Sequence, residues 1–399
     1  MKKNILISLL SLVLISAAIV YYLLPTKPVA YIGVHHIAPE DIPGGNNPIL
    51  DEEYSIFLCE LENEVHQLIG RYKTPGLAVA VVMDDKIIYK KGFGYRNAEN
   101  QYPVTTSTVF RIGSVSKGFA STLVGLMEDE NVVNWQDPIT KFLPDYKVDP
   151  VDYTDSITIE HILSHTAGYP YQAYSTLIED GRTLDDMIDL LQGLRLSRKP
   201  GEIHSYQNVA YSIIEKILEE ETQCSFDELM NERIFAPLNM TDASMDYHTI
   251  VNHNNVAYPH YFSRFGVHVG KIRPTYYNAS AAGGVNASID DMSEWLMAIM
   301  GNRPDVISDR VRAEIFDPQV VTSVKNSYLS RLDYPRNGYY GLGWRIIEYP
   351  NDTIVYHEGY VNGYKSAIGF SKSKDIGICI IANSGGRLTS RLLAEIFKK

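Results

Sequence analysis

Cysteine is scarce in this sequence, and the few cysteines that occur lie far apart. Cys59, Cys224 and Cys379 are the only three in 399 residues. An odd number at such wide spacing provides neither a disulfide framework nor a metal-binding pattern. Cys379 lies in an apolar run typical of a strand, so we interpret it as a small buried hydrophobic residue.

Positive charge is also in short supply. The 36 lysine and arginine residues are outnumbered by 48 aspartate and glutamate residues, which gives a net charge of −12. Nucleic-acid binding needs clustered lysine and arginine, and no such cluster stands out, so we expect no nucleic-acid partner. There is no internal repeat. The hydrophobic fraction of 45% is ordinary for a globular protein, and the length suits one two-lobed domain or two domains.

The amino-terminal residues have the pattern of a membrane segment. Two lysines precede an uncharged run over residues 4–26, of which 5–24 are mainly apolar. This length fits a bilayer span, with the rest of the chain translocated. We therefore expect residues 1–25 to be a signal anchor or a cleaved signal peptide. We favour the anchor, because the apolar run continues past the small residues at 16–18 that could form a cleavage site.

The folded part is expected to begin near residue 50. Residues 26–49 are rich in proline, glycine and asparagine, a composition typical of a tether. Apolar residues at helical spacing predict a helix over 50–72, and strand-like runs follow at 76–83 and 87–90. The amino-terminal end of the folded part is therefore predicted to be a helix followed by a hairpin.

The other end of the chain repeats this strand-rich character. Four more strand-like runs precede a final helix at about 387–398; they lie at 342–347, 353–357, 364–370 and 376–382. Most patterns between the two ends are helical, namely 183–193, 209–221, 226–234 and 290–300. We expect a sheet lobe over about 50–113 and 336–398, with a helical lobe over about 118–335 inserted between its halves. Ser114 lies at the boundary, where a cleft can form.

Ser114 and Lys117 form the most informative pattern. They lie three positions apart, directly before an apolar, helix-forming run over 118–127. Residues three apart on a helix share a face, so we expect the Lys117 amine to reach the Ser114 hydroxyl. A serine needs a neighbouring base to attack a carbonyl at neutral pH, and a partly buried lysine can accept that proton. N–H groups at the first helical turn would favour an oxyanion there.

This pattern is weak on its own, because Ser371 and Lys374 also match it. The second match lies in a polar string between two apolar runs, which predicts a hairpin turn. Two further motifs follow Ser114 in order. They are Tyr-Gln-Asn at 206–208, before a helical pattern, and His-Glu-Gly at 357–359, before a strand.

These three motifs in this order resemble those of the serine β-lactamase-like family, which includes class C β-lactamases, D-amino-acid-specific peptidases and related esterases. The likeness covers about residues 52–398 and includes Gly-Leu-Gly-Trp at 341–344. The resemblance implies a β-lactamase/transpeptidase-like fold of penicillin-binding-protein type. Its fold class is α/β (α+β), with an antiparallel sheet flanked by helices and an inserted all-helical lobe.

The resemblance also implies the catalytic residues. Ser114 would be the nucleophile. The Tyr206 phenol, when deprotonated near Lys117, would be the base for Ser114 and later the acid for the leaving group. Whether Lys117 or Tyr206 takes the first proton stays open. Asn208 would hydrogen-bond the substrate amide or ester, and the alternative for Asn208 is a helix N-cap.

His357 marks a departure from the β-lactamases of this family, which carry a lysine there. Histidine is mostly neutral at pH 7, so it attracts a carboxylate less strongly while keeping a hydrogen-bond donor at the site. Gly359 would let the strand approach a substrate, and the Tyr360 N–H would complete an oxyanion hole with the Ser114 N–H. The substrate class is therefore expected to be an ester or a D-amino-acid peptide.

No metal and no cofactor are expected. His161 and His165 lie four apart and could share a helical face, but no third ligand accompanies them and no His-Glu-x-x-His motif occurs. The expected partners are a small-molecule or peptide substrate and, through the amino-terminal segment, a membrane. The sequence makes no prediction of the oligomeric state.

Our hypothesis from the sequence is a serine hydrolase that forms an acyl-enzyme on Ser114 and acts outside the cytoplasm. The alternatives are a β-lactamase, and a penicillin-binding or sensor protein that is acylated without turnover. The expected location is the bacterial cell envelope, on the extracytoplasmic face of the inner membrane or in the periplasm. The protein would be secreted if the amino-terminal segment is cleaved.

Overall fold

The structure, a computed structural model, describes residues 54–324, 328–332 and 335–398. The expected membrane segment and the expected tether, which together cover residues 1–49, lie outside the described residues. Within the described part of the chain, no helix combines the length and the apolar character that a bilayer span requires.

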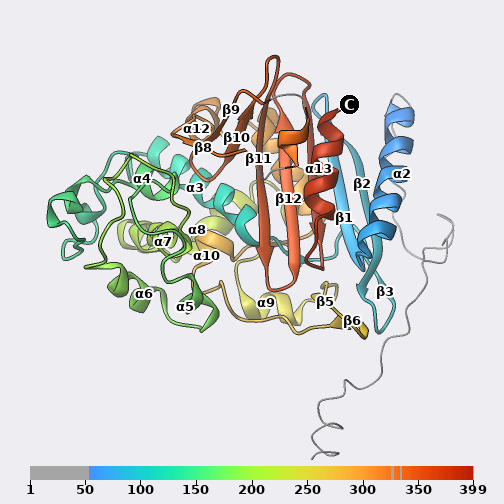
Figure 1. The fold of residues 1–399 in the computed structure, drawn as a ribbon, viewed down its shortest axis with the longest axis horizontal. Coiled ribbons are helices and arrows are strands. Elements are labelled where there is room, and N and C mark those ends of the chain that lie inside the picture. The colour runs from blue at the N-terminus through green and yellow to red at the C-terminus, as the bar shows by residue number, and fades with distance from the viewer. Residues whose placement is uncertain (1–53, 325–327, 333–334, 399) are drawn as a thin grey trace, which may run out of the picture.

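A nine-stranded antiparallel sheet forms the centre of the molecule (Figure 1). Its strand order is β3-β2-β1-β13-β12-β11-β10-β9-β8, so strands from the two ends of the folded chain meet where β1 pairs with β13. The nine strands are β1 (Gly76–Met83), β2 (Lys86–Asn97), β3 (Tyr102–Pro103), β8 (Val320–Thr322), β9 (Asn337–Tyr340), β10 (Arg345–Glu348), β11 (Thr353–Val361), β12 (Tyr364–Ser371) and β13 (Ile376–Ala382). Two small pairs lie outside this sheet: β4 (Phe110–Arg111) with β7 (Asn286–Ala287), and β5 (His260–Ser263) with β6 (Gly266–Val269).

The other regular elements are helical. The α-helices are α2 (Ser55–Tyr72), α3 (Ser116–Asp129), α4 (Ile159–Leu163), α5 (Ser175–Glu179), α6 (Leu184–Leu191), α7 (Asn208–Thr222), α8 (Phe226–Met230), α9 (Tyr247–Asn252), α10 (Ser280–Gly283), α11 (Ile289–Met297), α12 (Asp309–Ile315) and α13 (Leu388–Lys398). Short 3₁₀ turns are η3 (Gly113–Val115), η4 (Ile139–Lys141), η5 (Val151–Ser156) and η8 (Leu329–Arg331), and single π turns are η6 (Asn231–Phe235) and η7 (Ala298–Asn302).

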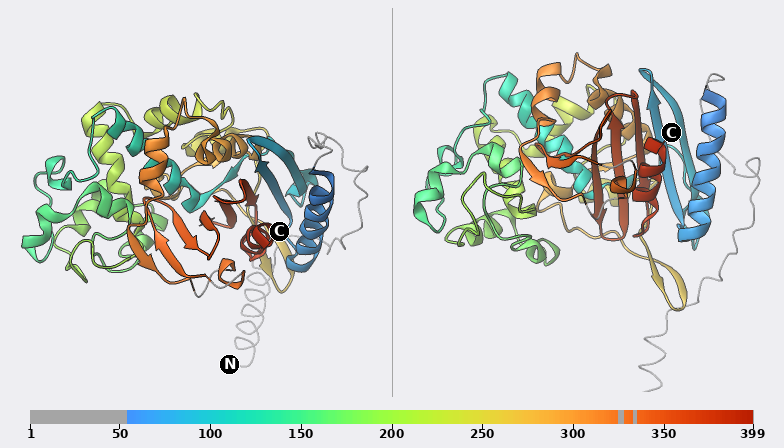
Figure 2. Two further views of the ribbon diagram at one scale, coloured as in Figure 1. Left: turned by 90° about the horizontal axis from the view of Figure 1, so that it is seen from above. Right: turned by 45° about the horizontal axis from the view of Figure 1, so that its top comes forward.

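Both faces of the sheet are covered, which explains the apolar character of its central strands. Helices α2 and α13 lie against one face, and α11 lies against the other (Figure 2). Every residue of β13 is therefore buried, and the strand is apolar throughout instead of alternating. On the α11 side, Phe119 of α3 stacks on Trp295 with ring centroids 3.8 Å apart. This contact joins the helical region to the sheet in one core.

Most of the predicted strands and helices occur in the structure, but several bounds differ. Strand β2 continues to Asn97 and β11 to Val361, beyond the predicted 87–90 and 353–357. Two further differences have a clear physical reason. The strand predicted from residue 342 begins only at Arg345, because Gly343 has a φ of +77° and turns the chain. The region 118–335 was expected to be all-helical, yet it also contributes β8 to the sheet and contains the hairpin β5–β6. These strands are only three or four residues long, too short for an apolar alternation to be recognisable.

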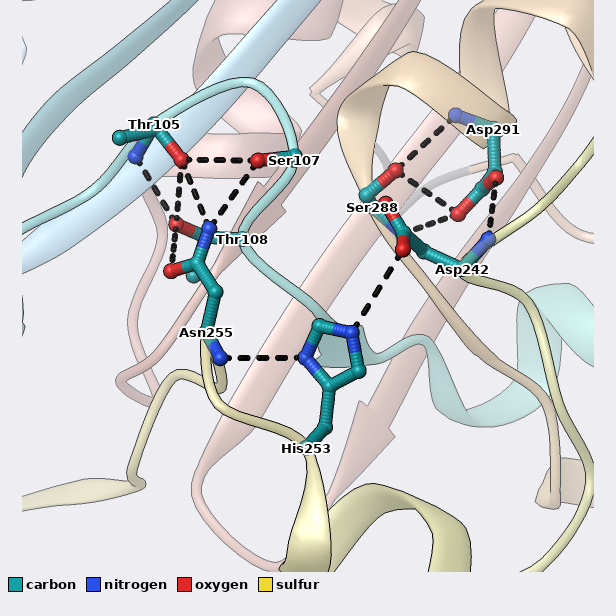
Figure 3. A network of polar contacts seen from close by, with 8 residues as sticks. All are labelled: Thr105, Ser107, Thr108, Asp242, His253, Asn255, Ser288 and Asp291. Carbon is teal, nitrogen blue, oxygen red and sulfur yellow. Dashed lines mark hydrogen bonds and ion pairs between the residues drawn. The ribbon is translucent and has the colours of Figure 1, made fainter. Parts of the chain in front are cut away.

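A polar network holds the segment that leads into β4 and then to Ser114 (Figure 3). Asn255 Nδ2 donates to Thr105 Oγ1 at 2.9 Å, and the Asn255 N–H donates to His253 Nδ1 at 3.2 Å. His253 Nε2 lies 3.5 Å from Asp242 Oδ1, and the Asp242 N–H donates to Asp291 on α11 at 3.2 Å. The network therefore connects the loop before β4 with the helix that covers the sheet.

Candidate active site

Ser114 lies in the turn η3, immediately before α3. The sequence predicted it in the first turn of an α-helix, but the 3₁₀ turn covers Gly113–Val115 and α3 begins at Ser116. Gly113 has a φ of +52°, and a Cβ there would lie 3.0 Å from the backbone N of Tyr360. Glycine is therefore required both for the turn and for the close approach of β11. The serine is presented where the helical region meets the sheet.

The hydroxyl of Ser114 is hydrogen-bonded to a phenol from a distant part of the chain. Tyr206 Oη donates to Ser114 Oγ at 3.0 Å, although 92 positions separate the two residues. Tyr206 is 8% exposed and lies just before α7. Burial raises the pKa of the Tyr206 phenol above its ordinary value, while the hydrogen bond to Ser114 and the charge of Arg345 oppose that rise. The phenol is thus protonated at neutral pH.

Lys117 is fully buried and lies beside Tyr206. Its Nζ donates to Asn208 Oδ1 and to the carbonyl of Ala282, both at 2.8 Å, and lies 4.8 Å from the centroid of the Tyr206 ring. Burial, followed by the charge of Arg345, holds the pKa of Lys117 well below its ordinary value. The expected hydrogen bond from Lys117 to Ser114 is not formed between these described residues, because Ser114 precedes the α-helix and does not share its face.

Asn208 belongs to the site and is not a helix cap. It is the first residue of α7, and the N-cap position is Gln207, which makes no side-chain cap bond. While its Oδ1 accepts from Lys117, its Nδ2 donates to Gln172 Oε1 at 3.1 Å. Both ends of the Asn208 amide therefore have partners within the protein, and one of those partners is Lys117.

His357 lies on β11 at the back of the site, but it offers no free donor. Its Nδ1 donates to the carbonyl of Glu358 at 2.9 Å, so its Nε2 must accept the hydrogen bond from Tyr340 Oη at 3.2 Å. The residue is 1% exposed, and burial lowers the pKa of its imidazole well below the ordinary value. The expectation of a neutral His357 fits this pKa shift. The expectation that it donates to a substrate does not fit, because the Glu358 carbonyl and the Tyr340 hydroxyl together occupy both ring nitrogens.

Gly359 and Tyr360 continue β11 past the Ser114 turn. A Cβ at Gly359 would collide with the carbonyl of Ile112, so only glycine allows this approach. Ser366 Oγ, on the neighbouring strand β12, donates to the same Ile112 carbonyl at 2.6 Å. The Tyr360 side chain is 57% exposed, while its backbone lies against Gly113. The structure therefore brings the β11 backbone next to the nucleophile.

Two residues near the site, Arg345 and His165, were not predicted to take part in catalysis or substrate binding. The guanidinium of Arg345 lies 5.9 Å from the Tyr206 ring centroid and 5.6 Å from that of Tyr340. Within the described residues, no carboxylate pairs with Arg345. His165 packs on Tyr206 with ring centroids 4.2 Å apart, and its Nδ1 accepts the N–H of Gln207 at 3.3 Å. These contacts join separate segments, so no local pattern could have indicated them.

The histidine pair considered for a metal site is used in other ways. His161 Nδ1 bonds to Thr158 in the cap of α4, while His165 lies against Tyr206. Among the described residues, no group of three or more His, Cys, Asp or Glu residues could hold a metal ion.

Comparison with known proteins gives the family. The model of the beta-lactamase family matches residues 61–398, so the chain belongs to this family. Among solved structures, the octameric penicillin-binding protein homologue from Pyrococcus abyssi superimposes with a TM-score of 0.74 at 25% identity, over 86% of this chain and 78% of that one. The β-lactamase/transpeptidase fold predicted from the sequence is thereby confirmed.

Two curated relatives show similar levels of identity. The chain is 27% identical to the unguisins hydrolase of Aspergillus campestris over 331 residues, which are 80% of this chain and 60% of that protein. It is 24% identical to the protein flp of Staphylococcus aureus strain MRSA252 over 329 residues, which are 81% of this chain and 62% of that protein. The chain therefore spans less than two thirds of the length of these relatives. The family match supports an activity of the serine hydrolase or acyl-transfer type.

Proposed function

We propose that this protein is a serine hydrolase in which the substrate acylates Ser114 and water then hydrolyses the acyl-enzyme. The observation that carries the proposal is the hydrogen bond between Tyr206 Oη and Ser114 Oγ, 3.0 Å long, beside the buried amine of Lys117. A hydroxyl in contact with a proton-accepting system is what nucleophilic catalysis by serine requires. The word hydrolase in the name of the Aspergillus relative supports the same reaction class.

Lys117 and Tyr206 share the proton transfer in this proposal. The lowered pKa of Lys117 favours the neutral amine, which is the form able to accept a proton, and Tyr206 is the group in contact with Ser114. Tyr206 passes its own proton to Lys117 and receives that of Ser114 as the bond from Ser114 Oγ to the carbonyl carbon forms. The same phenol then returns the proton to the leaving group. The reverse sequence, with water in place of the leaving group, breaks the acyl-enzyme.

The backbone of the turn η3 and of β11 would stabilise the oxyanion. We propose that the N–H groups of Ser114 and Tyr360 point at the reacting oxygen. The support is the contact between Gly113 and the Tyr360 backbone, which brings these two segments together beside the nucleophile.

An ester or a D-amino-acid peptide is the substrate class we propose. His357 stands where the resemblance places the lysine of β-lactamases, and it is neutral with both ring nitrogens bonded inside the protein, so it supplies no positive charge for a substrate carboxylate. We further propose that the reaction takes place outside the cytoplasm, on the basis of the membrane-like pattern of residues 5–24.

A labelling experiment tests the nucleophile first. A fluorophosphonate probe should label the wild type and Tyr349→Phe, but not Ser114→Ala. A panel of short esters and D-peptides then identifies the substrate class by turnover. Equal labelling of Ser114→Ala would overturn the proposal.

The alternatives give different results in the same samples. Nitrocefin turnover far above that of Ser114→Ala would indicate a β-lactamase. A stable β-lactam adduct on Ser114 in intact-mass spectra, without turnover of any panel member, would indicate a penicillin-binding or sensor protein. The similarity to the penicillin-binding protein homologue of Pyrococcus abyssi is the observation that favours this second alternative.

A further inference from the structure

One long segment of this acidic chain contains no acidic residue. Residues 247–289 have neither aspartate nor glutamate, although the whole protein has a net charge of −12. The same segment carries three cationic side chains, Arg264, Lys271 and Arg273, all of which are exposed. The acid-free segment thus carries positive charge and no negative charge of its own, although Glu179 of α5 accepts a hydrogen bond from Thr275 within it.

The centre of this segment is the hairpin β5–β6, which projects from the body of the molecule (Figures 1 and 2). It carries three exposed aromatic side chains: Tyr261 is 38% exposed, Phe262 47% and Phe265 51%. The guanidinium of Arg264 lies over the Phe265 ring, 4.6 Å from its centroid. The hairpin tip, residues 262–265, thus combines apolar rings with a cation.

The first two residues of β5 hold the hairpin against the body of the protein. Tyr261 Oη donates to the carbonyl of Asn362 at 2.8 Å, and the N–H of His260 donates to the carbonyl of Asn383 at 2.7 Å. By contrast, Phe262 and Phe265 belong to none of the hydrophobic clusters of the described residues. The two phenylalanines therefore add nothing to the core, and exposing them to water has a cost that a partner would remove.

We propose that the hairpin tip docks onto an anionic lipid membrane, with Phe262 and Phe265 entering the headgroup region. Aromatic rings and arginine are the side chains that favour the membrane–water interface, because each combines an apolar body with a polar or charged end. The absence of acidic residues from the segment itself reduces the repulsion that the rest of the protein would meet at an anionic surface, and Arg264, Lys271 and Arg273 add attraction. The membrane pattern of residues 5–24 would bring the body close to such a surface.

This docking would orient the candidate active site relative to the bilayer. Tyr261 contacts the turn between β11 and β12, and that turn closely follows Tyr360. The membrane-facing hairpin therefore lies next to the strand that borders the nucleophile. The docking itself needs no chemistry at Ser114, so it can be tested apart from the proposed function.

The test measures whether the tip contacts lipid in the full-length protein. Phe265→Trp introduces an indole at the tip, and Val321→Trp introduces one at an exposed position, 69% exposed, on β8, an edge strand of the sheet that lies away from the hairpin (Figure 1). The natural tryptophans at 135, 295 and 344 are buried and provide a steady background. Each variant is mixed with vesicles of brominated phosphatidylglycerol or brominated phosphatidylcholine. Far-UV circular dichroism confirms that both variants are folded.

We expect the bromine atoms to quench the added emission of Phe265→Trp by about half or more in phosphatidylglycerol, and that of Val321→Trp little. Adding Arg264→Gln to Phe265→Trp should lower the ratio of inserted to free tip about fivefold, whereas Arg264→Lys should leave it nearly unchanged. Equal quenching at both positions, or at neither, would overturn the proposal. Equal quenching in the two lipids would also overturn it. A concentration-dependent dimer that shields the tip, and that is lost in the double variant Phe262→Ser/Phe265→Ser, would do the same.

Discussion

Lys117 and Tyr206 are neighbours, and burial shifts their pKa values in opposite directions. The pKa of the lysine falls and that of the tyrosine rises, because a buried site disfavours both the ammonium and the phenolate. Burial therefore favours the uncharged form of both groups, an amine and a phenol. The amine can then take up a proton during the reaction, and the phenol is already in contact with Ser114.

The pH profile should report the protonation of Lys117. We expect kcat/KM for an ester to fall as the pH drops through the lowered pKa of Lys117, because a protonated amine cannot accept a proton. Lys117→Arg should be inactive at every pH, since arginine stays charged. Lys216→Arg, which replaces a lysine on the outer side of α7, serves as the control. An active Lys117→Arg enzyme would show that the amine is not part of the proton path.

Removing one oxygen from Tyr206 should be enough to suppress the reaction. Tyr206→Phe keeps the ring but loses the partner of Ser114 Oγ, and we expect kcat to fall about 10²–10⁴-fold. Tyr349→Phe is the matched control, because its hydroxyl donates to the carbonyl of Leu329, away from Ser114. Ester hydrolysis and the rate of fluorophosphonate labelling measure the effect. Unchanged rates in Tyr206→Phe would assign the base to another residue.

At the scale of helices and strands, α7 and α10 together hold the buried lysine. Glu215 of α7 accepts the N–H of Ala281 at 2.8 Å, and the next carbonyl, that of Ala282, accepts from Lys117. Burial raises the pKa of Glu215 to about 8. The carboxyl group that accepts the Ala281 N–H is therefore mostly protonated at neutral pH.

The free energy of unfolding should depend on pH through the protonation of Glu215. Its pKa is about 4.5 when unfolded and about 8 when folded, so the folded state binds more protons between these values. The free energy of unfolding therefore loses the contribution of this group as the pH rises from about 5 to 8. Glu215→Gln should gain stability relative to the wild type over this range, measured by urea unfolding at several pH values. The same gain in the exposed control Glu220→Gln would contradict this assignment.

At the scale of the whole molecule, the site exists because the helical region closes against the sheet. Ser114 and Lys117 precede or begin α3, while β11 brings up Gly359 and Tyr360 from the sheet. Helix α3 can come this close because Gly118 lies against the ring of Trp344. A Cβ at Gly118 would be 2.5 Å from Trp344 Cζ2. This glycine therefore sets the distance between the two halves of the site.

Gly118→Ala should disturb both halves at once. Overpacking costs about 1–3 kcal/mol and the better helix propensity of alanine returns up to about 1, so we expect a net loss of about 1–2 kcal/mol in the free energy of unfolding. Labelling of Ser114 should slow as well, because α3 moves with Lys117. Gly386→Ala, where a Cβ meets no atom within 4 Å, should change neither quantity. A Gly118→Ala protein as stable and as reactive as the wild type would contradict this packing.

Local patterns predicted much of this architecture. Strands β1, β12 and β13 lie within one residue of their predicted bounds, because continuous apolar runs bounded by turn residues are specific signals. The order of the motifs at 114–117, 206–208 and 357–359 also indicated the family that the comparisons found. The hairpin β5–β6 was missed, since four-residue strands give no period to recognise.

The amino-acid sequence by itself determined which residues could act: a serine with a lysine three positions on, a tyrosine before a helix, and a glycine in a strand. Only the tertiary structure decided how they act together. It put Tyr206, and not Lys117, in contact with Ser114, turned His357 inward and brought Arg345 beside the phenol. The physical reason is that pKa values and hydrogen-bond partners depend on burial and on neighbours from distant segments, which local spacing does not encode.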